Sequence, residues 1–257
     1  MKITVIGAGN MGGAMIRGWI ESGHVTPQEL TAVAVHETTL EAMRTLGVTA
    51  TTDAVEAVRE AEVVILAVKP WLVEGVAQQI ADSVPSHALV GSVAAGIDLK
   101  TLVKSFGGRA LFRIMPNTAV RVRQGMTFLT AAGATEAQRQ TMTALFEALG
   151  RVMEVPEAQL DSCMAVASCG IAYALRYVRA AMEGGIELGL KPAAAQEMVA
   201  QTLIGAAELL LQTGNHPEVE IDRVTTPGGV TIRGLNAMEA HGFSHAVIEG
   251  LKASTVK

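Results

Sequence analysis

The sequence predicts an α/β protein in two domains, a doubly wound β-sheet over residues 1–155 followed by an all-helical domain over residues 156–257. In the first part, short apolar runs alternate with helical patterns, which is typical of a parallel sheet covered on both faces. After residue 156, strand-like runs disappear and apolar residues recur every three or four positions. Of the 257 residues, 49% are hydrophobic and 18% charged, so a sizeable buried core is available.

The expected strands are short runs of aliphatic and β-branched residues bounded by Gly, Pro or polar residues. They cover Ile3–Ile6, Ala32–Val35, Val63–Val68, Leu89–Val93, Ala110–Ile114 and Met126–Leu129. The helices expected between them cover Met11–Ser22, Thr38–Leu46, Ala54–Glu60, Leu72–Ala81 and Leu99–Ser105. Because the strands are continuous apolar runs separated by helices, we expect them to lie parallel.

The second part predicts one long helix from Leu160 to Ile186, followed by another from Pro192 to Thr213. Both helices are apolar around most of their circumference, which indicates burial on several sides. A chain of this size has too little mass of its own to cover two such helices. We therefore expect a second copy of the chain to cover them, which makes the protein a homodimer.

Composition and charge exclude several classes of protein. The net charge is −5 and the basic residues are scattered, which disfavours binding to nucleic acid. Cys163 and Cys169, the only cysteines, cannot form a disulfide framework, and no His or Cys cluster suggests a metal. The first residues lack the apolar core of a signal peptide, and the uncharged stretch Cys163–Leu175 is too short to span a bilayer. We expect a soluble cytoplasmic protein with no membrane association.

A glycine motif gives the strongest functional signal. The run Gly7-Ala8-Gly9-Asn10-Met11-Gly12 directly follows a strand and opens a helix, which is the context of the Rossmann dinucleotide fingerprint. The first glycine allows a tight turn, the second a close approach of the pyrophosphate, and the third close helix–strand packing. We expect NAD or NADP to bind Ile6, Gly7, Gly9, Asn10, Met11 and Gly12. A glycine-rich turn without a ligand is the alternative.

The residues after the second expected strand bear on the choice between NADH and NADPH. Glu37 could bond the ribose 2′-hydroxyl and repel a 2′-phosphate, which favours NAD. His36 and the hydroxyls of Thr38 and Thr39 could instead receive a phosphate, although this segment contains no Arg or Lys before Arg44. Glu37 could also do no more than begin the next helix, where an acidic residue suits the dipole. The sequence leaves these alternatives open.

Three further segments follow strands, where doubly wound sheets bind their ligands. Val68, Lys69 and Pro70 place a cation and a helix-initiating proline after one strand. Small residues, including Ala94 and Ala95, follow the next, and Asn117 follows the strand after that. Taken singly, each segment is ordinary for an α/β protein, and Lys69 alone could be a solvated surface charge.

A second motif lies near the C-terminus. Pro227, Gly228, Gly229, Val230 and Thr231 precede an apolar-periodic helix. A Pro-Gly-Gly run followed by Thr at a helix start presents free backbone N–H groups and a hydroxyl, which suit an anion such as a carboxylate. The alternative is a capped turn between helices, without a ligand.

In order along the chain, these segments resemble the pyrroline-5-carboxylate reductase family, which catalyses the last step of proline biosynthesis. The resemblance covers essentially the whole chain and is most specific at Val224–Thr231. It implies a Rossmann domain followed by a helical dimerisation domain, with dimers assembled in some members into larger rings, up to a decamer. It also implies reduction of a small cyclic imino acid, pyrroline-5-carboxylate, with NADPH or, less often, NADH.

The resemblance also implies roles for individual residues. The glycine loop binds the pyrophosphate, while Val68, Lys69, Pro70, Ala94, Ala95 and Asn117 line the ribose and nicotinamide side. Backbone groups of Gly228, Gly229 and Val230 hold the substrate carboxylate, and Thr231 is the catalytic residue, with its hydroxyl near the imine. Because an imine nitrogen is readily protonated, the mechanism mainly requires positioning and exclusion of water.

The chain departs from the family on the long helix, where members usually carry Ser-Gly-Ser-Gly-Pro-Ala-Tyr. Here Ala167 and Ser168 replace the first Ser-Gly pair, and Ile171 replaces the proline. A reductase of a different cyclic imine is therefore an alternative, as is a nucleotide-binding regulatory homologue without turnover. A β-hydroxyacid dehydrogenase is disfavoured, because that family uses a lysine on its central helix and residues 157–190 contain none.

Overall fold

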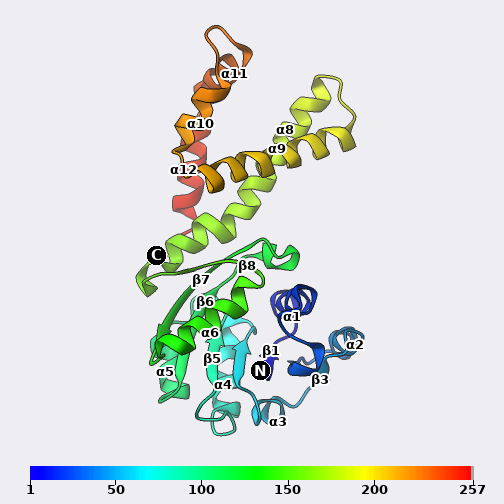
Figure 1. Ribbon diagram of the computed structural model, residues 1–257, viewed down its shortest axis with the longest axis vertical. Helices are drawn as coiled ribbons and strands as arrows, with labels where there is room; N and C mark the ends of the chain where they lie inside the picture. Colours follow the sequence, from blue (N-terminus) through cyan, green and yellow to red (C-terminus); the bar gives the residue numbers. More distant parts are fainter. Residues whose placement is uncertain (256–257) are drawn as a thin grey trace. The chain divides into compact units, whose positions relative to one another are not determined.

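The computed structural model describes residues 1–255, and the chain divides into two compact units, Met1–Ser168 and the residues from Cys169 onward. The first unit contains an eight-stranded sheet in the order β3-β2-β1-β4-β5-β6-β7-β8 (Figure 1). The strands are β1 (Ile3–Ile6), β2 (Leu30–Val33), β3 (Thr49–Thr51), β4 (Val63–Leu66), β5 (Leu89–Ser92), β6 (Ala110–Met115), β7 (Gly125–Ala132) and β8 (Gly150–Glu154). The six expected strands are present. The sequence did not indicate β3 and β8, because both are short and partly exposed rather than apolar runs.

The expectation of an entirely parallel sheet is wrong at one place. β7 runs antiparallel to β6, whereas the other neighbouring pairs of strands are parallel. Only the 3₁₀ turn η3 (Thr118–Val122) connects β6 to β7. A parallel connection needs a crossover of about a dozen residues or more, usually a helix, so this short link allows only the antiparallel arrangement. The helix α6 (Glu136–Glu147) then returns the chain to β8, parallel to β7.

Helices cover both faces of the sheet, as expected. One core cluster joins the sheet to α1 (Asn10–Ser22), α2 (Glu37–Arg44) and α6, and a second joins it to α3 (Ala54–Val58), α4 (Val73–Ile80) and α5 (Leu99–Phe106). Trp19 fixes α1 against α6, because its indole N–H donates to the carbonyl of Leu145 at 2.8 Å and its ring packs edge-on against Phe146. Burial of these two aromatic side chains stabilises the packing of α1 and α6 on one face of the sheet.

The register of the sheet brings the ends of four strands into one row. Ile6 of β1 lies opposite Leu66 of β4, which lies opposite Ser92 of β5, which lies opposite Arg113 of β6. The segments that follow β1, β4, β5 and β6 therefore leave the sheet at the same edge. The strand order also reverses between β1 and β4, and ligands of doubly wound sheets bind in the crevice at such a point.

The helical region begins within the first unit. After the 3₁₀ turn η4 (Glu157–Gln159), α7 (Leu160–Cys163) leads into a π-helical segment, Met164–Cys169. The expected long helix from Leu160 to Ile186 is present as a continuous helical stretch, but this segment of it is π-helical rather than α-helical. The carbonyl of Ala167 accepts a hydrogen bond from Asn117, so this part of the helix has a partner outside its own backbone. Single-turn π-helical stretches are frequent at functional sites.

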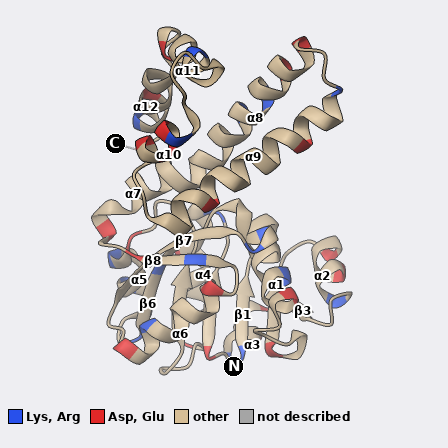
Figure 2. Ribbon diagram, turned by 45° about the horizontal axis from the view of Figure 1, so that its top comes forward, with Lys and Arg blue, Asp and Glu red and all other residues tan. Residues whose placement is uncertain are grey.

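The second unit is all-helical and contains α8 (Gly170–Glu187), α9 (Pro192–Thr213), α10 (Pro217–Val224), α11 (Val230–Ala240) and α12 (Phe243–Ala253). Figure 2 shows that α8 and α9 carry few charged residues. Nevertheless, Ala195 is the only residue from 169 to 255 whose side chain is buried within the chain. The apolar surfaces of α8 and α9, expected to be buried on several sides, are thus largely uncovered by this chain itself.

Within residues 1–255, one helical stretch is long and apolar enough to cross a membrane by length and composition alone. It is Glu157–Glu187, whose most apolar 18-residue window has a mean hydropathy of 1.2. This stretch extends on both sides beyond Cys163–Leu175, its uncharged part. Length and composition do not distinguish a membrane span from a helix that packs against protein.

Candidate active site

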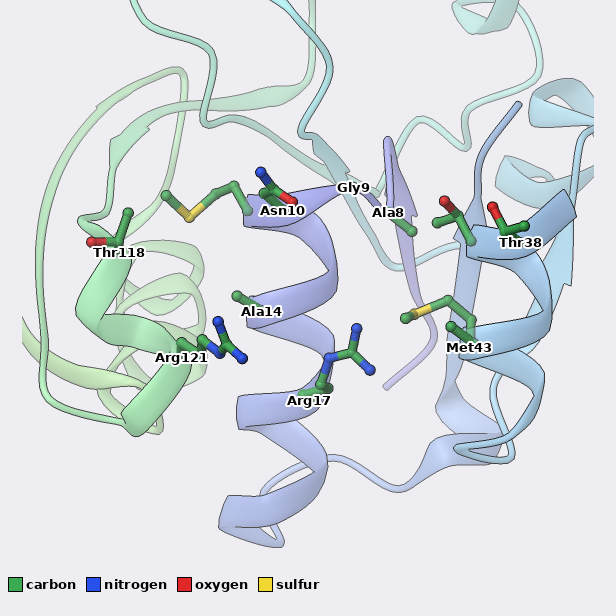
Figure 3. A pocket seen from close by; sticks show the side chains of 12 residues that line it. Ala8, Gly9, Asn10, Ala14, Arg17, Thr38, Met43, Thr118 and Arg121 are labelled. Atoms are coloured by element: carbon green, nitrogen blue, oxygen red, sulfur yellow. The ribbon is translucent and has the colours of Figure 1, made fainter. Parts of the chain in front are cut away.

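A cavity of about 810 Å³ opens around the N-terminus of α1, between α2 and η3 (Figure 3). Its wall includes four residues of the glycine motif and the two threonines in the first turn of α2. The lining residues are Ala8, Gly9, Asn10, Met11, Ala14, Arg17, Thr38, Thr39, Ala42, Met43, Thr118 and Arg121. The cavity therefore begins at the glycine loop and follows the outer face of α1 toward α2.

The glycines of the motif have the geometry that a dinucleotide requires. Gly7 has a φ of +99°, and a Cβ atom there would lie 2.6 Å from the carbonyl oxygen of Ala67. A Cβ on Gly12 would lie 2.2 Å from the carbonyl oxygen of Gly7. By contrast, no atom lies within 4 Å of the position that a Cβ on Gly9 would take. The space before Gly9 is thus open to a phosphate, so these residues fit the pyrophosphate of a dinucleotide.

Backbone donors at the same place complete the fit. The first backbone bond of α1 runs from the N–H of Gly13 to the carbonyl of Gly9. The preceding N–H groups of the first turn, including those of Asn10 and Met11, have no partner within the helix. Gly9 caps the helix without a side-chain acceptor, and the first turn holds no acidic residue. This helix end therefore offers free donors and a positive dipole to an anion.

The residues expected to choose between NADH and NADPH have separate positions. Thr38 and Thr39 line the cavity, whereas His36 and Glu37 do not. Glu37 begins α2, and its carboxylate forms an ion pair with Arg44 on the exposed face of that helix. His36 precedes α2 without capping it through its side chain.

The segments after β4 and β5 lie at the crevice edge. Val68 contacts the glycine loop, since its Cγ1 lies 3.0 Å from the position that a Cβ on Gly7 would take. Lys69 is exposed, and Pro70 begins the 3₁₀ turn η2 (Pro70–Leu72). After β5, Ala94 is buried and its N–H donates to Ser92 Oγ, while Ala95 is exposed.

Asn117 is held by hydrogen bonds within the first unit. Its Oδ1 accepts from the N–H groups of Ala119 and Met126, and its Nδ2 donates to the carbonyl of Ala167. The residue is only 5% exposed. These bonds give Asn117 a role in positioning the loop after β6, and its contact with a coenzyme stays a prediction.

The second motif forms the start of α11 in the helical unit. Gly228 has a φ of +70°, and a Cβ on Gly229 would lie 2.4 Å from Thr226 Oγ1, so both positions favour glycine. Gly229 caps α11 without a side-chain acceptor, and no acidic residue stands in the first turn. Val230 and Thr231 are exposed. The N–H of Gly229 donates to the carbonyl of Thr226 at 2.9 Å. The N–H groups of the first turn of α11, from Val230 onward, have no partner within the helix, and with the hydroxyl of Thr231 they fit a carboxylate ligand.

In the first unit, the structure brings together the glycine loop, Val68, Thr38 and Thr39. In the second unit, Gly228 through Thr231 lie together at the start of α11. Sequence reasoning missed Arg17 and Arg121, the two charged residues that line the cavity. Helical spacing could have indicated Arg17, since it follows Asn10 by seven positions on the same face of α1. No group of three or more potential metal ligands occurs in the part of the chain that the structure describes.

Comparisons with known proteins agree with this architecture. The family profile described as pyrroline-5-carboxylate reductase dimerisation matches residues 157–257, and one described as NADP oxidoreductase coenzyme F420-dependent matches residues 2–96. Pyrroline-5-carboxylate reductase from Methanosarcina acetivorans is 35% identical over 98% of this chain and 96% of its own length. The protein of that name from Synechocystis is 36% identical over 99% of this chain and 96% of its own length.

Solved structures show the same relationship. A pyrroline-5-carboxylate reductase from Coxiella burnetii has 30% identity and a TM-score of 0.90, covering 99% of this chain and 96% of that one. The Streptococcus pyogenes enzyme has 29% identity and a TM-score of 0.85, covering 99% and 98%. Similarity thus extends over both units and nearly the full length of each relative. On this evidence, the chain belongs to the pyrroline-5-carboxylate reductase family.

Proposed function

We propose that the protein reduces L-1-pyrroline-5-carboxylate to L-proline with NADPH or NADH, the last step of proline biosynthesis. One observation carries the proposal above all. The chain is similar to these reductases over its full length, and it has both an open glycine loop before α1 and a helix start at Gly229 without a side-chain cap. The first fits a dinucleotide pyrophosphate and the second fits a substrate carboxylate.

The residues of the chain have mainly binding and positioning roles in this reaction. Gly9 and the first turn of α1 would hold the pyrophosphate, and the N–H groups of the first turn of α11, from Val230 onward, would hold the substrate carboxylate. Thr231 lies in the first turn of α11, where its hydroxyl can orient the imine or relay a proton to its nitrogen. The imine nitrogen is basic enough to be protonated readily, so no strong acid is required from the protein. Bound NAD(P)H supplies the hydride.

We infer that two copies of the chain form a homodimer in the cytoplasm. Exposed apolar side chains on α8 and α9, such as Leu175 and Ile204, need cover that this chain alone does not provide. The dimerisation profile that matches from residue 157 supports this arrangement and a domain boundary between residues 155 and 156. A ring of such dimers, up to a decamer, is an extension of the same proposal.

A different cyclic imine is the second candidate substrate. The helix motif departs from the family at Ala167, Ser168 and Ile171. Ser168 Oγ is also buried without a hydrogen-bond partner among the residues described, and such a group is uncommon in native proteins. We infer from the resemblance that this motif borders the substrate pocket, so a buried hydroxyl in place of the usual glycine supports a change in the imine that is accepted.

The decisive experiment follows the oxidation of NADPH and of NADH, separately, with pyrroline-5-carboxylate as acceptor. We expect consumption with at least one coenzyme and formation of L-proline, detected chromatographically. Coenzyme binding without consumption would contradict the proposal. In that case, a panel of other cyclic imines would separate the second candidate from a regulatory homologue without turnover.

A further inference from the structure

We propose that Arg17 receives the 2′-phosphate of NADPH and thereby selects this coenzyme over NADH. The inference rests on the proposed use of NAD(P)H and names the side chain that distinguishes the two forms. It assigns the selection between NADPH and NADH to a residue of α1, whereas the sequence indicates the residues directly after β2.

The guanidinium group of Arg17 folds back along α1 toward the glycine loop. Its Nη2 lies 3.7 Å from the position that a Cβ on Gly13 would take. The same position is 3.1 Å from the carbonyl oxygen of Ala8 and 3.8 Å from Cε of Met43 in α2. Because Gly13 has no side chain, the guanidinium can lie between the glycine loop and α2. Figure 3 shows it on the side of α1 that faces Met43.

The charge of the cavity wall suits a phosphate. Arg17 and Arg121 are its only charged lining residues, and no carboxylate lines it. Neither arginine forms an ion pair with any residue in the described part of the chain. The hydroxyls of Thr38 and Thr39 stand in the same wall, in the first turn of α2. A guanidinium group, which can donate two parallel hydrogen bonds, binds a phosphate dianion strongly when hydroxyl donors lie beside it.

Glu37 does not oppose this assignment. A carboxylate after the second strand disfavours a 2′-phosphate when it points to the ribose. Here Glu37 lies outside the cavity lining and pairs with Arg44. Its negative charge is therefore balanced by a neighbour, and the unpaired cation Arg17 lies on the cavity side.

The position of Arg17 also separates it from the pyrophosphate. The pyrophosphate of a bound dinucleotide would lie at the N-terminus of α1, whereas its adenosine ribose would lie toward the end of the second strand, β2. Thr38 and Met43 of α2 line the same cavity as Gly9 of the glycine loop and Arg17 of α1, so the cavity reaches from the glycine loop to α2 (Figure 3). NADPH differs from NADH only by the 2′-phosphate, so a cation in this part of the cavity would stabilise bound NADPH more than bound NADH.

Calorimetric titration with 2′,5′-ADP and with 5′-AMP tests the proposal without any imine substrate. We expect the wild-type protein to bind 2′,5′-ADP at least about tenfold more tightly than 5′-AMP. Arg17→Met, which keeps most of the apolar stem, should reduce this ratio to within about twofold. Arg59→Met, which removes an exposed cation outside the cavity, should leave the ratio unchanged. Arg121→Met tests whether the other cation of the cavity wall also contributes to the ratio.

An unchanged ratio in Arg17→Met would overturn the proposal, as would equal binding of both nucleotides by the wild-type protein. If Arg17→Met does not fold, Arg17→Gln provides the second variant, with thermal unfolding as the check. Because these titrations contain no imine, their outcome is separate from the test of pyrroline-5-carboxylate reduction. In the coenzyme assay, the NADPH to NADH ratio of kcat/KM should fall by the same factor.

Discussion

The side-chain amide of Asn117 donates a hydrogen bond of 3.1 Å to the carbonyl oxygen of Ala167. The bond connects the loop after β6 to the π-helical segment that leads out of the first unit. It joins positions that are fifty residues apart in sequence. The segment in which the chain departs from its family is therefore positioned from the end of the sheet.

Replacing Asn117 should destabilise the first unit. Asn117→Ala leaves two N–H groups and one carbonyl without their partner in a buried place, for which we expect a loss of about 2–4 kcal/mol in the free energy of unfolding. Urea unfolding at a fixed protein concentration measures it. Gln79→Ala, at an exposed position of α4, is the control. A loss below about 0.5 kcal/mol in Asn117→Ala would show that these bonds do not hold the loop.

Two glycines of the α1 motif should respond differently to a methyl group. Gly9→Ala places its Cβ in open space and Gly12→Ala places it 2.2 Å from a carbonyl oxygen. Both variants should bind NADPH at least about tenfold more weakly, but only Gly12→Ala should lower the thermal stability of the unliganded protein. Fluorescence titration and thermal unfolding separate the two effects. Normal coenzyme binding by Gly9→Ala would show that the glycine loop is not part of the coenzyme site.

The hydroxyl of Thr231 should contribute to turnover and not to coenzyme binding. Loss of one hydrogen bond to the reacting imine predicts that Thr231→Ala lowers kcat about tenfold, with the Kd for NADPH nearly unchanged. Thr231→Ser restores the hydroxyl and should recover most of the rate. If coenzyme binding collapses in Thr231→Ala, the residue supports the structure and the assigned role is wrong.

A charge on α9 should dissociate the proposed homodimer. Ile204 is 57% exposed within the chain, so an aspartate there is tolerated by one copy but becomes costly where a second copy covers the helix. For Ile204→Asp we expect a dimer Kd raised by about a hundredfold or more, together with loss of activity at low protein concentration. Sedimentation velocity measures the change, with Gln79→Asp on α4 as the matched control. An unaltered dimer would place the interface elsewhere.

Asp98 should contribute to stability in a pH-dependent way. It caps α5 by accepting the N–H of Thr101 at 2.8 Å, and hydrogen bonds from Thr101 hold its pKa below the ordinary value of 3.8. A depressed pKa in the folded state means that the contribution is present above that ordinary value and is lost as pH falls through the folded value. Asp98→Ala should cost about 1 kcal/mol at pH 7 and progressively less below pH 3.8.

Urea unfolding of Asp98→Ala at pH 7 and at several lower pH values measures this profile. Asp98→Asn keeps an acceptor that does not titrate, so its small effect should not vary in the same way. A cost for Asp98→Ala that stays constant down to pH 2 would contradict a role for the ionised carboxylate.

Local pattern was sufficient to predict most of the sheet and the glycine loop. Apolar runs such as Ile3–Ile6 and Val63–Leu66 are continuous, and their parallel direction places Gly7 and Val68 side by side at one edge. The sequence pattern did not predict β3 and β8. Both strands contain exposed polar residues and depend on pairing with a neighbouring strand.

The features that sequence reasoning missed depend on contacts between distant residues. The π-helical segment accompanies the bond from Asn117, which no local periodicity reveals. The direction of Arg17 depends on the missing side chain of Gly13 and on the approach of Met43 from α2. The antiparallel direction of β7 depends on the shortness of its connection, and not on its own composition.

The glycine loop is fixed by the protein before any nucleotide arrives. The N–H groups of Gly7 and Ala8 both donate to the carbonyl of Val33, at 2.8 and 3.1 Å. The conformational entropy of the loop is consequently lost during folding and not during association. Coenzyme capture should therefore be a single kinetic step, with an observed rate that rises linearly with nucleotide concentration and without the plateau that a slow loop rearrangement imposes.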